Sequence, residues 1–315
     1  MLEMKRLRLL WELSARGTVA AVAEALNYSP SAVSQQLALL EREAGVPLLR
    51  KVGRTLELTR AAEGLVADTE HLLASLERAE ASLRSDRDEI SGRLRIAVFQ
   101  TAVLALMPQV LKRLRDEYPV LRVEMVQHEP EAALRETWAR GFDLVVAEQY
   151  PGHAAPHFAG LDREQLMRDP VQLALPLPRN GDRHFNRVQE VADAAALPWV
   201  MEPRGAASRH WAEQVCRSAG FEPDVRYETA DLQAHVRLIE SGNAVALLPG
   251  LVHLPNAPKL RLVDLPGFPQ RTLFTAARAS SRDRPELAAV RKALAFEARA
   301  LGLQEADLRE MNESE

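Results

Sequence analysis

The alternation of apolar and polar residues between Thr18 and Leu40 predicts two short helices with a turn between them. The apolar positions of the first helix recur at helical spacing: Val19, Val22, Ala23 and Leu26. The interruption at residues 27–30 contains Ser29, which suits an N-cap, and Pro30, which suits a first helical position. The pattern therefore predicts a second helix that begins at Pro30.

The second helix has two distinct faces. Its apolar face consists of Ala32, Val33, Leu37 and Leu40, and its outward face of Ser31, Ser34, Gln35 and Ala38. Small hydroxyls and an amide on an exposed N-terminal half can enter a major groove and hydrogen-bond base edges, while the helix N-terminus favours phosphate. A small helical bundle with a polar surface is the alternative that this pattern leaves open.

The residues after the second helix decide between these alternatives. The helix is predicted to end at Gly45, and residues 50–59 form a predicted hairpin with a basic tip. This arrangement resembles the winged helix–turn–helix of the LysR-type transcriptional regulators. The matching positions are Gly17-Thr18, Ser29, Ser31-Ala32-Val33-Ser34, Leu40-Glu41, Gly45, Pro47-Leu48 and Leu58-Thr59. The chain departs from the family at Ala20, Leu49, Lys51 and Ala62, where a hydroxyl residue, Phe, Arg and Gly are usual.

The resemblance implies that residues 1–59 bind double-stranded DNA. The residues expected at that interface are Thr18, Ser29, Pro30, Ser31, Ser34 and Gln35 of the helical part, with Lys51 and Arg54 of the wing. Charge supports this expectation: residues 1–60 contain nine basic and six acidic side chains, a net +3, whereas the whole chain carries −4. A basic head on an acidic remainder is typical when only the head meets phosphate.

A heptad pattern follows the predicted wing, from about Thr59 to Ser85. The seam consists of Ala62, Leu65, Thr69, Leu72, Leu76, Ala79 and Leu83, with Thr69 as its one polar member. An apolar stripe on a long helix must be buried, either by a partner copy or by the helix's own domain. The resemblance implies a linker helix, residues 60–91, that pairs two chains into a dimer, which the family extends to a tetramer. A two-fold dimer requires a dyad-symmetric operator.

Beyond Gly92 the pattern changes to alternating strands and helices. Predicted strands cover residues 93–99, 121–126, 142–147, 171–176, 199–201, 225–228, 244–248 and 272–277. Predicted helices cover residues 104–118, 132–140, 208–219, 232–241 and 285–300. Repeated strand–helix–strand units with apolar strands predict an α/β domain whose sheet is mostly parallel.

The stretches at residues 141–144 and 242–249 resemble strands of the LysR-family effector domain, so the resemblance spans nearly the whole chain. It implies an α/β effector-binding domain at residues 92–303 that resembles periplasmic binding proteins, with a cleft between two lobes. Lobe I is expected at about residues 92–166 and 268–303, and lobe II at about residues 167–267. Residues 304–315, which are acidic and polar, are expected to form a tail.

Ligands of open α/β sheets bind beyond the carboxyl ends of strands and near helix N-termini. The side chains expected there are Gln100, Thr101, His128, Glu148, Arg204, Ser208 and Thr229. Helix N-termini and Arg204 favour an anionic group on a small-molecule effector, while Glu148 and Glu202 favour a ligand that also carries an amine. No metal or other cofactor is expected.

Other classes of function have weaker support. The chain lacks P-loop, GxSxG and HExxH motifs, so an enzyme with a fused DNA-binding head is disfavoured. A plain solute-binding protein is disfavoured by the basic head and by an N-terminus without a signal-peptide pattern. The single cysteine, Cys216, and the absence of an apolar run of membrane length are typical of a cytoplasmic protein. RNA polymerase is a further candidate partner of such a regulator.

Overall fold

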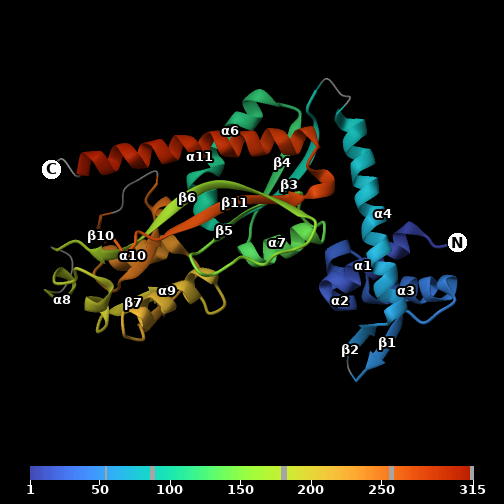
Figure 1. The fold of residues 1–315 in the computed structure, drawn as a ribbon, viewed down its shortest axis with the longest axis horizontal. Coiled ribbons are helices and arrows are strands. Elements are labelled where there is room, and N and C mark those ends of the chain that lie inside the picture. The colour runs from blue at the N-terminus through green and yellow to red at the C-terminus, as the bar shows by residue number, and fades with distance from the viewer. Residues whose placement is uncertain (54, 86–88, 179–182, 255–258, 313–315) are drawn as a thin grey trace. The chain divides into compact units, whose positions relative to one another are not determined.

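The computed structural model describes residues 1–53, 55–85, 89–178, 183–254 and 259–312, with side chains undescribed at residues 55, 84, 85, 183 and 303–312. Within these ranges, the chain forms two compact units, one built mainly on residues 1–88 and the other mainly on residues 89–315 (Figure 1). No helix in the described ranges combines the length and apolar character needed to cross a membrane.

The first unit is mainly helical. Its elements are α1 (Met4–Arg16), α2 (Val19–Leu26), α3 (Pro30–Ala44), β1 (Leu49–Val52), β2 (Thr55–Leu58) and α4 (Arg60–Ser85). Leu10, Val22, Val33 and Leu40 belong to the shared core of α1, α2 and α3. Trp11 is 1% exposed, and Leu9 and Leu13 of the same helix are also buried, whereas Ser14 is exposed.

Helix α4 changes its environment along its length. Ala62 is buried and Leu65 packs against the core of the first unit, and the Thr69 hydroxyl donates a hydrogen bond of 2.6 Å to the Leu65 carbonyl. Farther along, Leu72 and Leu76 are about half exposed, at 47% and 49%. The first part of the predicted seam is therefore covered within the chain, and the second part leaves large apolar side chains in solvent.

The second unit is an α/β structure. Its helices are α5 (Gln100–Ala105), α6 (Met107–Glu117), α7 (Pro130–Trp138), α8 (Arg183–Asn186), α9 (Ala207–Ser218), α10 (Leu232–Glu240) and α11 (Pro285–Asn312). Short 3-10 turns are η1 (Val191–Ala194), η2 (Gly250–His253) and η3 (Ala279–Ser281). Its strands are β3 (Gly92–Val98), β4 (Leu121–Gln127), β5 (Leu144–Gln149), β6 (Leu161–Pro176), β7 (Pro198–Met201), β8 (Asp224–Glu228), β9 (Ala246–Pro249), β10 (Leu260–Val263) and β11 (Gln270–Arg278).

The main sheet is mixed, which corrects the expectation of a mostly parallel sheet. Its strand order is β10-β6-β11-β5-β3-β4, and β9 pairs with β6 outside this path. Only β3 pairs in parallel, with β4 and β5, whereas β11 pairs antiparallel with both β5 and β6. The long strand β6 contributes to this difference. Its first half pairs antiparallel with β11, and its second half pairs antiparallel with β9 and β10.

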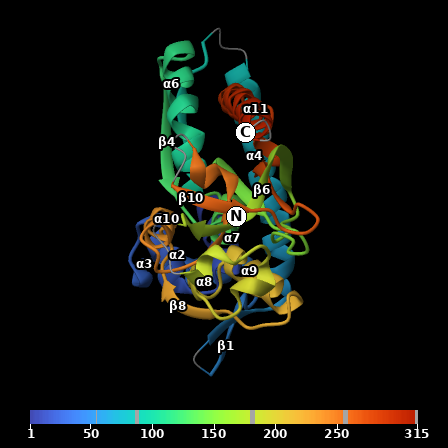
Figure 2. The same cartoon turned by 90° about the vertical axis from the view of Figure 1, so that its left-hand side faces the viewer.

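Lobe I comprises β3, β4, β5, β11 and the first half of β6, with helices α5, α6, α7 and α11. Leu106, Val110 and Leu294 pack in one apolar core on the face covered by α6 and α11, which lie on the same side of the sheet in Figures 1 and 2. Ala133 and Leu134 of α7 pack in a separate core with alternate residues of the same strands. The sheet of lobe I is therefore covered on both faces.

Lobe II comprises the second half of β6, strands β7 to β10 and helices α8, α9 and α10, and it is turned toward the viewer in Figure 2. Strands β7 and β8 are parallel, and Trp199 forms a parallel bridge to Val245, which precedes β9. Trp211 and Cys216 of α9 are buried on one side, while Val236 and Ile239 of α10 are buried in another core. Burial raises the pKa of the Cys216 thiol to about 12, so this thiol stays protonated.

Three predicted boundaries differ in the structure. The helix expected at residues 104–118 is two helices that meet at Leu106, because Pro108 in the first turn of α6 cannot donate a backbone hydrogen bond to the preceding turn. The strand expected at residues 171–176 begins ten residues earlier, at Leu161. The tail expected from Gln304 instead continues α11 as far as Asn312.

Candidate functional site

Local capping interactions define the ends of helices α2 and α3. The Thr18 hydroxyl accepts a hydrogen bond of 3.1 Å from the Ala21 N–H at the start of α2. The Ser29 hydroxyl accepts one, also of 3.1 Å, from the Ala32 N–H at the start of α3. Asn27 ends α2 in a left-handed conformation, with a φ of 55°, which short polar side chains tolerate best. The turn between the helices is therefore fixed by residues within it.

The face of α3 expected to contact DNA is exposed. Ser31, Ser34 and Gln35 lie on it in solvent, as does Pro30 in the first turn, while Val33, Leu37 and Leu40 of the opposite face are buried. The side chains of Ser34 and Gln35 make no hydrogen bond to any residue within the described ranges. The Ser31 and Ser29 hydroxyls lie 3.0 Å apart. This face can therefore donate and accept hydrogen bonds without first breaking any bond of Ser34 or Gln35.

The wing is anchored to the end of α3. One carboxylate oxygen of Glu41 accepts hydrogen bonds from the backbone of Leu48, at 2.8 Å, and Leu49, at 3.0 Å. Lys51 is exposed on β1, as a phosphate contact requires, whereas Arg50 pairs with Glu57 across the hairpin. The predicted contact Arg54 lies outside the described residues.

Several basic side chains near α3 are engaged within the head. Arg6 donates to Gln36 at 3.0 Å and pairs with Glu43. Arg16 pairs at 2.8 Å with Glu12, a carboxylate that is only 1% exposed. Arg8 lies 3.7 Å from the same carboxylate, across one helical turn. Arg6 and Arg16 are therefore held in ion pairs within the head.

In the second unit, a cavity of about 410 Å³ lies where α7 of lobe I faces the loop before α9 of lobe II. It is lined by Glu129, Pro130, Glu131, Ala132, Arg135, Glu148, His153, Ala155, Glu202, Pro203, Arg204, Gly205, Ala206, Ala207, Ser208 and Ala230. This volume suits a small ligand. The backbone N–H groups at the starts of α7 and α9 border it, and α9 has no side-chain cap. We refer to this cavity as the interlobe cleft.

The seven residues expected to contact a ligand are divided by the structure. Glu148, Arg204 and Ser208 line the interlobe cleft. Gln100, Thr101, His128 and Thr229 are not among its lining residues. The His128 ring instead packs edge-on against Phe142, with ring centroids 5.8 Å apart.

Arg271 is the centre of a buried polar network beside the cleft. Its guanidinium donates to Asp169 at 2.8 Å and to the Thr101 hydroxyl at 2.8 Å, and it also pairs with Glu148. Arg271 is 1% exposed and Asp169 is fully buried. Burial raises the pKa of both carboxyls, and attraction to Arg271 opposes that shift. Thr101 is therefore held by Arg271 rather than turned toward the cavity.

Gln100 connects the two lobes. Its side-chain amide donates to the Asp231 carboxylate at 2.7 Å, and its carbonyl oxygen accepts from the Leu232 N–H at 2.9 Å. Asp231 is the N-cap of α10 in lobe II, whereas Gln100 is the first residue of α5 in lobe I. Thr229, two residues before Asp231, accepts from the Asp231 backbone at 3.2 Å. This pair of bonds fixes the separation of the two helix ends.

The carboxyl of Glu202 in the cleft wall has a strongly raised pKa. Burial raises the pKa of its carboxyl to about 7, repulsion from Glu148 and Glu129 adds to the shift, and a hydrogen bond from Ser208 opposes it. Glu202 can therefore exchange a proton near neutral pH. The described residues contain no group of three or more His, Cys, Asp or Glu side chains that could hold a metal ion.

The sequence alone did not identify Arg271, Asp169 or Asp231 as site residues. Arg271 is separated from Asp169 by 102 positions and from Thr101 by 170, so no spacing rule relates them. The one available signal is a charged residue at the start of an otherwise apolar predicted strand. Such a residue needs a partner if its strand is buried.

Two protein families match the chain, and together they cover most of it. The family described as "Bacterial regulatory helix-turn-helix protein, lysR family" matches residues 4–63. The family described as "LysR substrate binding domain" matches residues 87–298. The two matches contain the exposed face of α3 and the interlobe cleft, respectively.

Individual relatives agree with these matches. The transcriptional dual regulator GltC of Bacillus subtilis is 25% identical over 269 residues, which cover 85% of this chain and 88% of GltC. Full-length OxyR from Pseudomonas aeruginosa, with a cysteine-to-aspartate substitution, superposes with a TM-score of 0.65 at 16% identity and covers 93% of this chain and 95% of its own. The regulator CbnR, solved in complex with its target DNA, superposes with a TM-score of 0.52 at 21% identity over 94% of this chain and 100% of its own.

Proposed function

This chain belongs to the LysR family of bacterial transcriptional regulators, and from that membership we propose that α3 reads an operator sequence under the control of a small molecule in the interlobe cleft. The family membership gives the general function, a DNA-binding regulator with an effector-binding domain. The observation that supports the finer proposal is the face of α3, where Ser34 and Gln35 are exposed and unbonded within the described chain. That CbnR is solved with its target DNA is consistent with it.

On this proposal, residues 1–59 form the DNA-binding domain. Thr18, Ser29 and Pro30 fix the start of α2 and α3 against the phosphate backbone, since N-terminal N–H groups suit phosphate oxygens. Ser31, Ser34 and Gln35 contact base edges, where hydroxyls pair with several bases and an amide pairs best with adenine. Lys51 contacts phosphate from the wing, and Arg54 is assigned there on the sequence alone.

We propose that α4, within residues 60–91, pairs with α4 of a second copy. Leu72, Leu76 and Leu83 are 47%, 49% and 72% exposed although all three belong to the heptad seam. An exposed apolar row on a long helix is stabilised when an identical row covers it. Sedimentation of the full chain should show a dimer or tetramer that Leu76→Glu dissociates; a wild-type monomer at all concentrations would contradict the pairing.

Residues 92–303 are proposed as the effector-binding domain. Glu148, Arg204 and Ser208 would contact the ligand directly, because they line the cleft. Gln100, Thr101 and Thr229 would act at its edge, by holding the two lobes and Arg271 in place. The position of His128 supports a role in packing against Phe142 only.

The cleft favours a small effector with both an anionic and a cationic group. The uncapped start of α9 and Arg204 suit a carboxylate, whereas Glu202 and Glu129 suit an ammonium. A thermal-shift comparison of α-amino acids with matched dicarboxylates and amines would test this class. Stabilisation by dicarboxylates alone would contradict the cationic half of the proposal.

DNA recognition is tested by binding of the full chain to DNA upstream of its own gene, across a range of salt concentrations, with shuffled DNA as control. Selective binding with a steep salt dependence supports the proposal, because each phosphate contact releases a counterion. Equal binding to both DNAs would contradict sequence reading. Because the protein would act on DNA, we propose that it is cytoplasmic and that RNA polymerase is a candidate partner; no enzymatic activity is proposed.

A further inference from the structure

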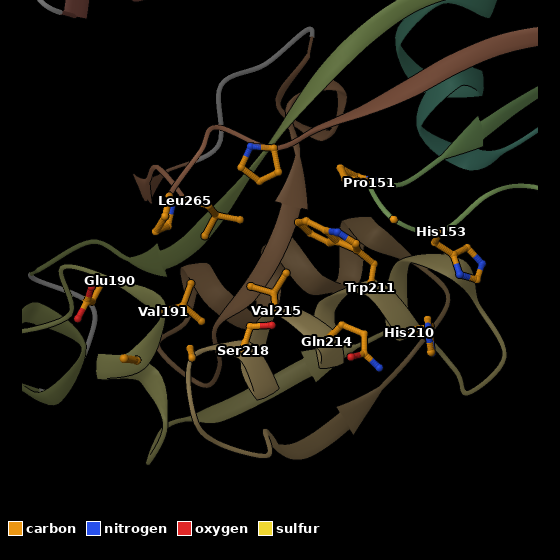
Figure 3. A pocket seen from close by; sticks show the side chains of 15 residues that line it. Pro151, His153, Glu190, Val191, His210, Trp211, Gln214, Val215, Ser218 and Leu265 are labelled. Atoms are coloured by element: carbon orange, nitrogen blue, oxygen red, sulfur yellow. The ribbon is translucent and has the colours of Figure 1, made fainter.

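A second cavity, of about 590 Å³, lies beside α9 in lobe II (Figure 3). It is lined by Pro151, Gly152, His153, Glu190, Val191, Ala192, His210, Trp211, Gln214, Val215, Ser218, Ala219, Leu265, Pro266 and Pro269. His153 also lines the interlobe cleft, and the other residues named here do not. We refer to this second cavity as the α9 pocket. Its volume is within the range of small-molecule sites, about 300–1,000 Å³.

Helix α9 contributes a polar row and an apolar row to the α9 pocket. His210, Gln214 and Ser218 are spaced by four residues, so they form one polar line along the helix. Trp211, Val215 and Ala219 form the neighbouring apolar line with the same spacing. In Figure 3, Ser218, Gln214 and His210 lie along one edge, with Trp211 and Val215 between them and Leu265. A ligand here meets an apolar surface with the hydrogen-bonding groups of α9 along one side.

The opposite wall is rigid. It contains Leu265, Pro266 and Pro269, whose turn is closed by a 3.0 Å hydrogen bond from the Phe268 N–H to the Leu265 carbonyl. The Val171 N–H donates to the Pro269 carbonyl at 3.0 Å, which attaches this turn to β6. Phe268 adopts a φ of 47°, a left-handed conformation that is strained for an aromatic residue. The wall is therefore fixed before any ligand binds.

The charge of the lining disfavours an anionic ligand. Glu190 lines the pocket, where its carboxylate also accepts a backbone hydrogen bond at the start of η1. None of the described lining residues is Lys or Arg. A carboxylate or phosphate would therefore lose its hydration without gaining a fixed positive partner.

Trp211 presents both its ring and its indole N–H at the pocket wall. The side chain is only 7% exposed, and the indole N–H makes no hydrogen bond within the described part of the chain. The indole nitrogen is not itself fully buried, so its N–H is open to the pocket and can donate to a ligand. The ring lies 5.4 Å from the ring of the buried Tyr150, which gives the pocket a fixed aromatic surface.

We propose that the α9 pocket is a second ligand site, which binds a flat, uncharged aromatic molecule with hydroxyl or carbonyl groups along one edge. The aromatic body packs between Trp211 and the wall at Leu265, and the polar edge meets Gln214 and its neighbours in the polar row. Because His153 lines both cavities and its ring lies 5.2 Å from that of His210, an occupant of the α9 pocket is placed to alter the wall of the interlobe cleft.

The test uses the full chain labelled with 5-fluorotryptophan, whose four tryptophans give four fluorine resonances. The Trp211→Phe variant assigns the Trp211 resonance. The probes are 2-naphthol, its anionic counterpart 2-naphthoate, and cyclohexanol, which is neutral but not aromatic. We expect a saturable shift of the Trp211 resonance with 2-naphthol, at concentrations at least tenfold lower than for either other probe.

Two variants test the position of the probe. Val215→Phe fills the apolar floor and should weaken binding of 2-naphthol at least tenfold. Gln214→Ala, on an exposed position that cannot unfold the core, should weaken it about threefold to tenfold, the range for one lost hydrogen bond. Arg217→Gln is the matched control, because Arg217 lies on the same helix outside the pocket lining and should bind as the wild type does.

Three outcomes would overturn the proposal. A shift that rises linearly without saturation would show only weak solvent-like contact. Equal affinity for 2-naphthoate would contradict the argument from charge. Saturable binding that neither Val215→Phe nor Gln214→Ala weakens would place the probe elsewhere in the molecule.

Discussion

Both the exposed face of α3 and the region of the interlobe cleft contain Ser and Gln side chains, but the two regions differ in whether these side chains are hydrogen-bonded. Ser34 and Gln35 on α3 make no side-chain hydrogen bond within the described chain. In and beside the cleft, the Ser208 hydroxyl donates to Glu202, and the Gln100 amide is bonded at both ends to the start of α10. A ligand of the α3 face only displaces water. A ligand that bonds to Ser208 in the cleft must exchange places with an internal partner, Glu202.

This contrast explains why a regulator can respond to its effector without a flexible reading face. The α3 face is positioned by local caps and a buried opposite side, so its geometry is set within the head itself. The cleft residues belong to a network that joins two lobes, so exchanging one bond shifts the balance between lobe positions. A coupling free energy of about 1–3 kcal/mol is enough for such control.

The largest effect is expected on stability, when Arg271 at the centre of the buried network beside the cleft is replaced. Arg271→Met leaves the carboxylates of Asp169 and Glu148 buried beside no positive charge, which should lower the free energy of unfolding by about 3–5 kcal/mol. Chemical denaturation measures this change. The control is Arg217→Met, because Arg217 pairs with Glu222 in solvent and its loss should leave the unfolding curve in place. Equal curves for the two variants would show that the buried network is not stabilising.

The next largest effect is a pH dependence of the free energy of unfolding that arises from Glu202. Its folded pKa of about 7 lies above the ordinary value of 4.5, so the folded state holds a proton that the unfolded state releases between those two values. Glu202 therefore lowers stability progressively as the pH rises from 4.5 to 7. Glu202→Gln should raise the free energy of unfolding by up to about 3 kcal/mol at pH 8, at about 1.4 kcal/mol per pKa unit, and leave it unchanged at pH 4.

Denaturation curves of wild type and Glu202→Gln at the two pH values measure this difference. Ser218→Ala, a polar change on an exposed part of lobe II, serves as the control that should show no pH-dependent difference. A constant difference between wild type and Glu202→Gln at both pH values would contradict the assigned proton.

A smaller effect is expected on the α3 face. Gln35→Ala should reduce the discrimination between operator and shuffled DNA by about 1–3 kcal/mol, because one amide pairing with a base is lost. Competition binding at fixed salt measures it. Binding to shuffled DNA should be unchanged, and Ser14→Ala, an exposed change on α1, should alter neither. An equal loss on both DNAs would mean that Gln35 contacts the backbone instead.

The smallest effect is expected on the wing. Lys51→Ala should weaken binding to all DNA alike and reduce the slope of log affinity against log salt by about one. Salt titrations of the variant and the wild type on operator and shuffled DNA provide the measurement. A change that is confined to the operator would assign Lys51 to sequence reading.

The sequence predicted the head better than the cleft because the head depends on neighbours along the chain. Ser29, Pro30 and Gly45 each act within one helical turn, and all three take the positions that their chemistry favours. The first half of β6 was missed because it contains many charged residues. Two of these, Asp162 and Glu164, pair with Arg291 of α11, 129 and 127 positions away.

Prediction from the sequence is limited in the same way for single residues in and beside the cleft. Thr101 was expected to face a ligand because it follows the first strand of the α/β unit, but Arg271 binds its hydroxyl across 170 positions. Gln100 was likewise expected at the cavity, and the structure bonds it to the start of α10, 132 positions away. Strand ends can be located from local pattern, but the partner that occupies each side chain depends on the complete topology.

The return of β11 into the sheet of lobe I has a consequence for synthesis on the ribosome. Lobe I begins with β3 and is completed by β11 and α11, and the chain builds all of lobe II between them. Its core includes Leu287, Val290 and Leu294, so it cannot close until almost the whole protein has been made. We expect the helical head and lobe II to fold first, while β5 and the first half of β6 wait for β11, the strand that lies between them. A nonsense mutation before α11 would therefore prevent lobe I from folding, although most of the coding sequence of lobe I would remain.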